Sequence, residues 1–185
     1  MTSDNSLLPQ LEQLGRLSLP GKRHKYTIPA GFEDLPPLLK ALLVADGTVT
    51  VQVEAAFGED IRVSNVLQEP IASPCAIPVI NASVGTEIFY RHVDLIGSNT
   101  GEKYVSAWSI LNGTVMDRGL FHRLIDKEVG MGEVLRNAAR GSFREVLDMQ
   151  RDHSTDTVSR TYAVFLEATP CILITETFLI SRFRV

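Results

Sequence analysis

The strongest constraint on the fold of this chain is a repeated alternation of apolar and polar residues that begins after Gly47. A period of two predicts β-strands with one buried face. Short segments rich in Gly, Asn, Asp and Pro separate most of these stretches, and short turns join antiparallel rather than parallel strands. The stretches with this pattern are residues 49–53, 61–65, 87–96, 104–111, 143–149, 157–166 and 171–180.

Apolar residues at helical spacing occupy other parts of the chain. The predicted helices cover residues 10–14, 34–45, 120–125 and 131–138. Asp34 is the predicted N-cap of the second helix, and Pro36 and Pro37 suit its first turn. The sequence Asp46-Gly47 ends that helix with residues typical of turns.

Strands joined by short turns, with helices in separate segments, predict an α+β fold. We expect an antiparallel sheet of about six strands with flanking helices. A chain of 185 residues matches one domain of ordinary size. Residues 1–185 are therefore predicted to form a single domain, with residues 1–33 as an N-terminal lead-in.

Charge and composition exclude several classes of function. The 22 acidic and 18 basic residues give a net charge of −4, which argues against a general nucleic-acid binder. Two cysteines are too few for a disulfide framework or a thiolate zinc site. The N-terminus lacks the pattern of a signal peptide, and charges interrupt the longest apolar stretch, at 163–180. We expect a cytoplasmic protein that does not enter a membrane. We expect it to be a monomer or a homodimer.

Three charged residues lie where the strand patterns require apolar side chains. Arg91 shares one strand face with Phe89 and Val93, and Glu176 lies in the middle of an otherwise apolar face in the last strand. Arg160 is a third case. Burial of an unpaired charge is costly, so these residues must find partners.

Two interpretations of these charges are open. Arg91 or Arg160 forms a buried ion pair with Glu176, or the charges line an internal cavity. In a cavity, the planar guanidinium of Arg91 would bind a carboxylate through two parallel hydrogen bonds. Glu176 would then bind a hydroxyl group or take part in acid–base chemistry.

The other candidate signals are weak. Gly130-Met131-Gly132 lacks the third glycine of a dinucleotide-binding fingerprint and does not follow a strand. The four histidines show no metal-ligand spacing, and no motif of a Ser or Cys nucleophile is present. Trp108 is interpreted mainly as a packing residue, although it is also a candidate for lining a ligand cavity.

Four separated segments carry a further signal when they are taken together. They are DGTVT at 46–50, YRHVDL at 90–95, GMGEVL at 130–135, and RTY at 160–162 leading through a hairpin to LITETFL at 173–179. In order and spacing, over residues 35–183, the segments resemble the chorismate pyruvate-lyase (4-hydroxybenzoate synthase) family. The resemblance is strongest to its divergent branch in actinobacteria and archaea.

The resemblance implies a six-stranded antiparallel sheet with flanking helices that enclose an internal site for an aromatic acid. It also implies a carbon–oxygen lyase that needs no cofactor and converts chorismate to 4-hydroxybenzoate and pyruvate. By motif, Arg91 matches the arginine that binds the ring carboxylate, and Glu176 matches the glutamate that contacts the 4-hydroxyl end. Val49 and Met131 match positions whose backbone groups meet the ligand.

Two departures from the family pattern concern the site. The family usually has Pro-Leu-Gly at the helix start, where this chain has Gly130, Met131 and Gly132. Some members also have an arginine on the strand that follows the central arginine, but residues 107–109 supply none. Arg144 and Arg160 are the candidates to replace it as a second anchor for a dianionic substrate.

Two alternative functions remain open at this stage. The same fold resembles effector-binding domains of bacterial transcription regulators, which predicts a non-catalytic binder of small aromatic acids. The altered helix start and the missing arginine also allow a lyase that forms a different hydroxybenzoate. Turnover distinguishes the enzyme from the binder, and the aromatic product distinguishes the two enzymes.

Overall fold

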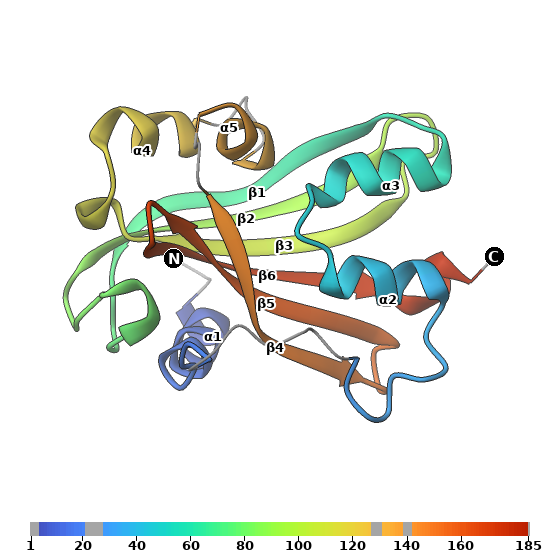
Figure 1. Cartoon of the computed structure of the whole chain (residues 1–185), viewed down its shortest axis with the longest axis horizontal. Coiled ribbons are helices and arrows are strands. Elements are labelled where there is room, and N and C mark those ends of the chain that lie inside the picture. Colours follow the sequence, from blue (N-terminus) through green and yellow to red (C-terminus); the bar gives the residue numbers. More distant parts are fainter. Residues whose placement is uncertain (1–3, 21–27, 127–130, 139–141, 185) are drawn as a thin grey trace.

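In the computed structural model, the strands of the described residues form one antiparallel sheet, and helices cover it (Figure 1). The structure describes residues 4–20, 28–126, 131–138 and 142–184. The helices are α1 (Asp4–Gly15), α2 (Pro37–Val44), α3 (Val49–Phe57), α4 (Arg118–Leu124) and α5 (Met131–Ala138). The strands are β1 (Ile61–Ala72), β2 (Glu87–Gly97), β3 (Lys103–Leu111), β4 (Phe143–Asp152), β5 (Thr157–Leu166) and β6 (Thr169–Leu179).

The sheet has six strands in the order β1-β2-β3-β6-β5-β4, and every neighbouring pair is antiparallel. The predicted α+β class and six-stranded antiparallel sheet are therefore confirmed. The last two strands of the chain form a hairpin, and β6 pairs with β3 at the centre. Residues 87–111 and 157–179 are thus brought together in the middle of the sheet.

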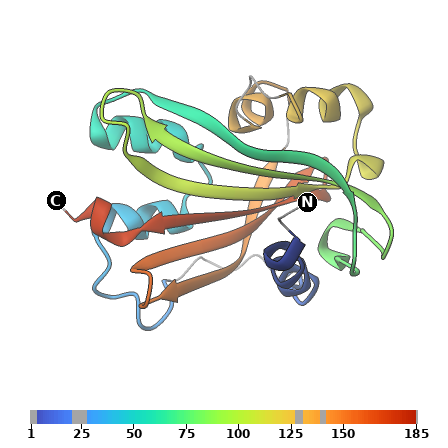
Figure 2. The ribbon, with the colours of Figure 1, turned by 180° about the vertical axis from the view of Figure 1, so that it is seen from behind.

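The two faces of the sheet pack against different helices. On one face, Leu11 and Leu14 of α1 pack with alternate strand residues such as Ile88 and Leu173. The opposite face packs against α2 to α5. Figures 1 and 2 show α1 apart from these four helices. The division follows the period of two, because successive strand residues point to opposite faces.

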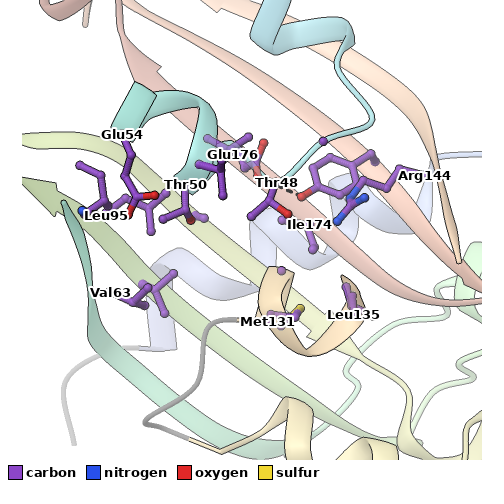
Figure 3. A pocket seen from close by; sticks show the side chains of 18 of the residues that line it. Thr48, Thr50, Glu54, Val63, Leu95, Met131, Leu135, Arg144, Ile174 and Glu176 are labelled. Carbon is purple, nitrogen blue, oxygen red and sulfur yellow. Dashed lines mark hydrogen bonds between the residues drawn. The ribbon is translucent and has the colours of Figure 1, made fainter. Parts of the chain in front are cut away.

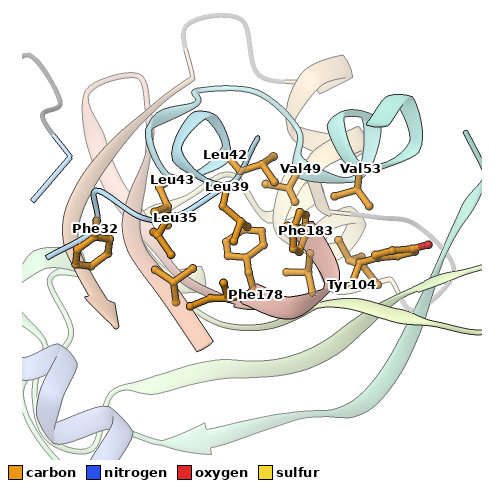
Figure 4. Packing of buried hydrophobic residues seen from close by; sticks show 14 of the residues in the cluster. Phe32, Leu35, Leu39, Leu42, Leu43, Val49, Val53, Tyr104, Phe178 and Phe183 are labelled. Carbon is orange, nitrogen blue, oxygen red and sulfur yellow. The ribbon is translucent and has the colours of Figure 1, made fainter. Parts of the chain in front are cut away.

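The face beneath α2 to α5 holds two separate hydrophobic clusters. The first, here called the α2–α3 cluster, joins Leu39, Leu43 and Val53 to Phe178 of β6 and neighbouring residues (Figure 4). The second, here called the α4–α5 cluster, joins the buried leucines of α4 and α5 to residues such as Ile172. Each helix pair therefore has its own core, which leaves the centre of this face between them.

One predicted strand is wrong. Residues 49–53 begin helix α3, in which Val49 and Val53 are buried and Val51 is exposed. Val49 and Val53 are four positions apart, so a helix places them on one face toward the α2–α3 cluster. Over five residues, the alternation of valines fits either period, and the packing selects the helix.

Several predicted boundaries also differ from the structure. Strand β1 extends beyond the predicted stretch 61–65 to Ala72 and includes Pro70. Because β1 is an edge strand, a proline without an N–H group is tolerated there. Asp34 does not cap α2; Pro36 is the N-cap residue, and Asp34 instead accepts hydrogen bonds from Arg151.

Candidate active site

A cavity of about 430 Å³ lies over the centre of the sheet, between the two hydrophobic clusters. Its floor comes from strands β1, β2, β3, β5 and β6, and α3 and α5 contribute to its walls (Figure 3). It is lined by Gly47, Thr48, Val49, Thr50, Val51, Glu54, Ile61, Val63, Arg91, Val93, Leu95, Ala107, Met131, Gly132, Leu135, Arg144, Tyr162, Ile174 and Glu176. The four predicted site residues Arg91, Glu176, Val49 and Met131 are all in this set.

The register of the strands explains how the floor forms. Val93 of β2 lies opposite Ala107 of β3, and Ala107 lies opposite Glu176 of β6. Ala107 is the small side chain in this row, so the space between Val93 and Glu176 stays open. Arg91 is two residues before Val93 and therefore points to the same face. Since only β3 separates β2 from β6, the backbones that carry Arg91 and Glu176 are roughly 10 Å apart across the strands.

Glu176 is the centre of a buried hydrogen-bond network. Arg160 lies opposite it on β5 and donates from Nε to Oε2 at 2.8 Å. Tyr162 donates from its hydroxyl to Oε1 at 2.9 Å. A further Arg160 nitrogen, Nη1, donates to the carbonyl of Ala45 at 2.8 Å. The ion-pair interpretation is therefore correct for Arg160 and Glu176, and Glu176 also lines the cavity.

The environment of this network fixes its charges. The pKa of Arg160 is raised: burial acts to lower it, but the Glu176 carboxylate and its neighbours outweigh that effect. Burial raises the pKa of Tyr162, and the Glu176 carboxylate raises it further. The tyrosine hydroxyl is therefore protonated and serves as a donor to the carboxylate.

Arg91 reaches the cavity from the other side. It is 2% exposed, and its Nη1 donates to the carbonyl of Leu124 at 3.1 Å. Gln68 donates to the next carbonyl, that of Ile125, so two side chains hold the end of α4 to the sheet. Burial lowers the pKa of Arg91, and Asp126 acts in the opposite direction. Burial thus penalises the charged guanidinium, and an anion bound in the cavity would offset that penalty.

The loop before α3 meets the start of α5 at the cavity wall. A Cβ atom added at Gly132 would lie 2.8 Å from Cγ2 of Thr48, so glycine permits this close approach. Val49 is 4% exposed, and Met131, which begins α5, is half-buried. The helix start expected at residues 130–132 is confirmed from Met131 onward, whereas Gly130 lies outside the described residues.

Two arginines were candidates for a second anion anchor, and the structure separates them. Arg144, at the start of edge strand β4, lines the cavity, and its Nη1 lies 3.1 Å from the carbonyl oxygen of Asp46. Arg160 is absent from the lining and is engaged by Glu176. The position of Trp108 settles its interpretation: it packs on the opposite face, against the cluster that contains Leu11.

Sequence reasoning missed several lining residues. Tyr162 enters the sequence analysis only as part of the RTY segment at 160–162, yet its hydroxyl contacts Glu176. Thr50 and Glu54 line the cavity because α3 is a helix, and the predicted strand hid that arrangement. Oε1 of Glu54 accepts a hydrogen bond from the backbone of Ile61, which ties α3 to β1. Correct prediction of the helix would have found both residues.

The described residues contain neither a metal-binding cluster nor a membrane-spanning helix. Within the parts of the chain that the structure describes, no group of three or more His, Cys, Asp or Glu side chains is arranged to hold a metal ion. No helix in those same parts has both the length and the apolar character needed to cross a bilayer.

The fold and the cavity define an α+β protein with a pocket over its sheet that is lined by apolar and charged side chains. The chain belongs to the Rv2949c-like chorismate pyruvate-lyase family, whose model matches residues 43–184. This match covers the sheet, α3, α4 and α5, and every residue that lines the cavity. No match was found among curated protein sequences.

Solved structures share the fold at low sequence identity. The effector domain of PhnF from Mycobacterium smegmatis is 13% identical and has a TM-score of 0.53, with 73% of this chain and 89% of that domain covered. PhnF itself, from the same organism, is 14% identical and has a TM-score of 0.55, with 92% of this chain and 76% of that chain covered. These similarities show a common fold.

Proposed function

We propose that this protein is a chorismate pyruvate-lyase that converts chorismate to 4-hydroxybenzoate and pyruvate without a cofactor. The observation that carries the proposal is the joint lining of one cavity by Arg91 and Glu176, in a member of the chorismate pyruvate-lyase family. Both residues are buried charges, and they reach the cavity from strands on either side of β3.

Arg91 binds the ring carboxylate in this proposal. A guanidinium donates two parallel hydrogen bonds to a carboxylate, and such charge-assisted contacts are stronger in a site that excludes water. The hydrogen bond to Leu124 holds Arg91 in place before the ligand arrives. The neighbouring apolar side chains, including Val93 and Leu95, provide surfaces for the ring.

Glu176 and Tyr162 bind the hydroxyl end of the ring. Each carboxylate oxygen has two acceptor positions, so Oε1 of Glu176 can accept from Tyr162 and from the substrate hydroxyl together. The ion pair with Arg160 holds Glu176 in a fixed orientation. Glu176 therefore acts as a hydrogen-bond acceptor that orients the substrate.

The reaction needs no water or second substrate. The bond between ring carbon 3 and the enolpyruvyl oxygen breaks, ring carbon 4 loses its hydrogen, and the enolpyruvyl methylene carbon gains a proton to form pyruvate. Formation of the aromatic ring supplies the driving force. The protein then contributes mainly orientation and stabilisation of the charge that develops on the departing enolpyruvate.

The direct test is incubation of the purified protein with chorismate. Pyruvate is followed by a coupled assay and aromatic products by chromatography, for wild type, Arg91→Ala and Glu176→Gln. Arg151→Gln is the matched control, because Arg151 lies on β4 in an ion pair with Asp34 outside the cavity. We expect equal amounts of pyruvate and 4-hydroxybenzoate from wild type and the control, and strong losses in both site variants.

One observation favours a second candidate function, a non-catalytic binder of aromatic acids. Both oxygens of Glu176 already accept hydrogen bonds, so the cavity holds this carboxylate as a fixed acceptor. Tight binding of 4-hydroxybenzoate with no pyruvate release would establish the binder and overturn the lyase. Pyruvate released with a different hydroxybenzoate would retain the site and change the named reaction.

A further inference from the structure

We propose that Arg144 binds the second carboxylate of a dianionic ligand, and that Asp46 occupies this position on Arg144 when no ligand is present. This inference deepens the proposed function, because chorismate carries a carboxylate on its ring and another on its enolpyruvyl group. It assigns the second anchor to β4 instead of the strand after Arg91.

Geometry selects Arg144 from the arginines near the cavity. Arg160 donates to Glu176 and to the carbonyl of Ala45 and does not line the cavity. Arg144 lines it on the side opposite Glu54, as Figure 3 shows, and only 17% of its side chain is exposed. Arg91 on β2 and Arg144 on β4 are therefore cationic groups at separate places on the cavity wall.

Asp46 is the internal anion that meets Arg144. The Nη1 atom of Arg144 lies 3.1 Å from the carbonyl oxygen of Asp46 and 3.5 Å from its carboxylate oxygen Oδ1. The side chain of Asp46 is 61% exposed, so water would solvate its carboxylate if the contact with Arg144 were lost. An ion pair this exposed is weak, and a carboxylate that enters the cavity can displace it.

The position of Asp46 places this exchange at the cavity wall. Asp46 directly precedes Gly47 and Thr48, which both line the cavity. Binding of a second carboxylate by Arg144 therefore releases Asp46 to solvent without moving an element of the sheet. A ligand with only the ring carboxylate leaves the pair of Arg144 and Asp46 intact.

The experiment uses two non-reactive ligands that differ in one carboxylate. The monoanion 3-methoxybenzoate and the dianion 3-(carboxymethoxy)benzoate share the ring acid and an ether oxygen at ring carbon 3, the position that carries the enolpyruvyl group in chorismate. Their dissociation constants are measured by titration calorimetry for wild type, Arg144→Gln and Arg144→Lys, with circular dichroism to confirm folding. We expect Arg144→Gln to raise the dissociation constant of the dianion about 10- to 100-fold and to leave that of the monoanion unchanged. Arg144→Lys should have an intermediate effect.

A second variant tests the exchange with Asp46. Asp46→Asn removes the competing carboxylate. This change is expected to lower the dissociation constant of the dianion about two- to fivefold, without effect on that of the monoanion. Asp34→Asn is the matched control. It removes the carboxylate that pairs with Arg151, another arginine of β4, and this pair lies outside the cavity. Unchanged or weaker binding of the dianion to Asp46→Asn would overturn the exchange.

The two proposals fail in different ways. If Arg144→Gln weakens both ligands equally, or neither, Arg144 is not the second anchor, whether or not chorismate is turned over. If chorismate is not turned over but the dianion preference depends on Arg144, the anchor stands and the lyase proposal fails. The calorimetric readout therefore judges the anchor without any catalytic step.

Discussion

Two arginines are buried on the same face of the sheet, yet their surroundings act on them in opposite directions. Arg160 and Arg91 are 1% and 2% exposed. The pKa of Arg160 is raised: burial acts to lower it, but the Glu176 carboxylate and its neighbours act more strongly in the opposite direction. The pKa of Arg91 is lowered, because burial outweighs the effect of Asp126.

This difference agrees with the roles proposed above, a structural charge at Arg160 and a ligand-binding charge at Arg91. The charge of Arg160 is balanced inside the protein by a carboxylate 2.8 Å away. Burial lowers the pKa of Arg91, and this side chain lines a cavity of about 430 Å³. In the proposed function, an anionic ligand in the cavity would favour the charged guanidinium and offset this effect of burial.

The largest expected effect is on stability, from Arg160→Met. This change leaves Glu176 buried without its ion-pair partner, which should lower the free energy of unfolding by about 3–5 kcal/mol. The measurement is urea unfolding followed by circular dichroism. The double variant Arg160→Met with Glu176→Leu removes both charges and should recover most of the loss. A double variant as unstable as the single one would show that the pair is not the cause.

The matching change at the other arginine, Arg91→Met, should act mainly on binding. Loss of the charged contact is expected to weaken the binding of 4-hydroxybenzoate by about 2–5 kcal/mol, as measured by titration calorimetry. The free energy of unfolding should change by less than about 1.5 kcal/mol, because the variant also removes the cost of a buried charge. A loss of stability equal to that of Arg160→Met would erase the distinction between the two arginines.

A smaller effect is expected from Tyr162→Phe. The change removes one hydrogen bond to the Glu176 carboxylate and keeps its ion pair with Arg160. Stability should fall by about 1.5–3 kcal/mol, less than for Arg160→Met. Thermal and urea unfolding of the two variants side by side would test this order, and the reverse order would place the main support of Glu176 in the tyrosine.

The smallest effect concerns Glu59, a carboxylate held by hydroxyl and amide donors. Glu59 accepts hydrogen bonds from Tyr104, Thr100 and the backbone of Asn99, which lower its pKa from 4.5 to about 2. The folded pKa is below the unfolded value, so its stabilisation is present above about pH 4.5 and is lost as the pH falls toward 2. Melting temperatures between pH 3 and 7 should fall less steeply for Glu59→Gln than for wild type; parallel profiles would contradict the assignment.

The sequence was sufficient for the long strands of the sheet and for two charged residues of the candidate site, Arg91 and Glu176. Long strands with alternating patterns, such as residues 157–166, identify themselves because ten residues distinguish a period of two from one of 3.6. Arg91 and Glu176 were recognisable as single charges on apolar faces. The roles assigned to Val49 and Met131 stay predictions, since their positions in the cavity wall are known but their ligand contacts are not tested.

The remaining features depend on distances between segments that are far apart in the sequence. The pairing of Glu176 with Arg160, and not with Arg91, follows from the register of β5 with β6, which no local pattern encodes. The approach of Arg144 to Asp46 joins residues 98 positions apart. The valines of α3 were misread because five residues fit a strand and a helix equally well, and burial by distant residues decided between them.

The position of the cavity between the α2–α3 cluster and the α4–α5 cluster has a thermodynamic consequence. Leu95 belongs to the first cluster and Ile174 to the second, and both line the cavity. A bound aromatic ring would contact both sides and complete a continuous core across this face. Folding and ligand binding would then be linked, so the melting temperature would rise with the logarithm of ligand concentration above the dissociation constant.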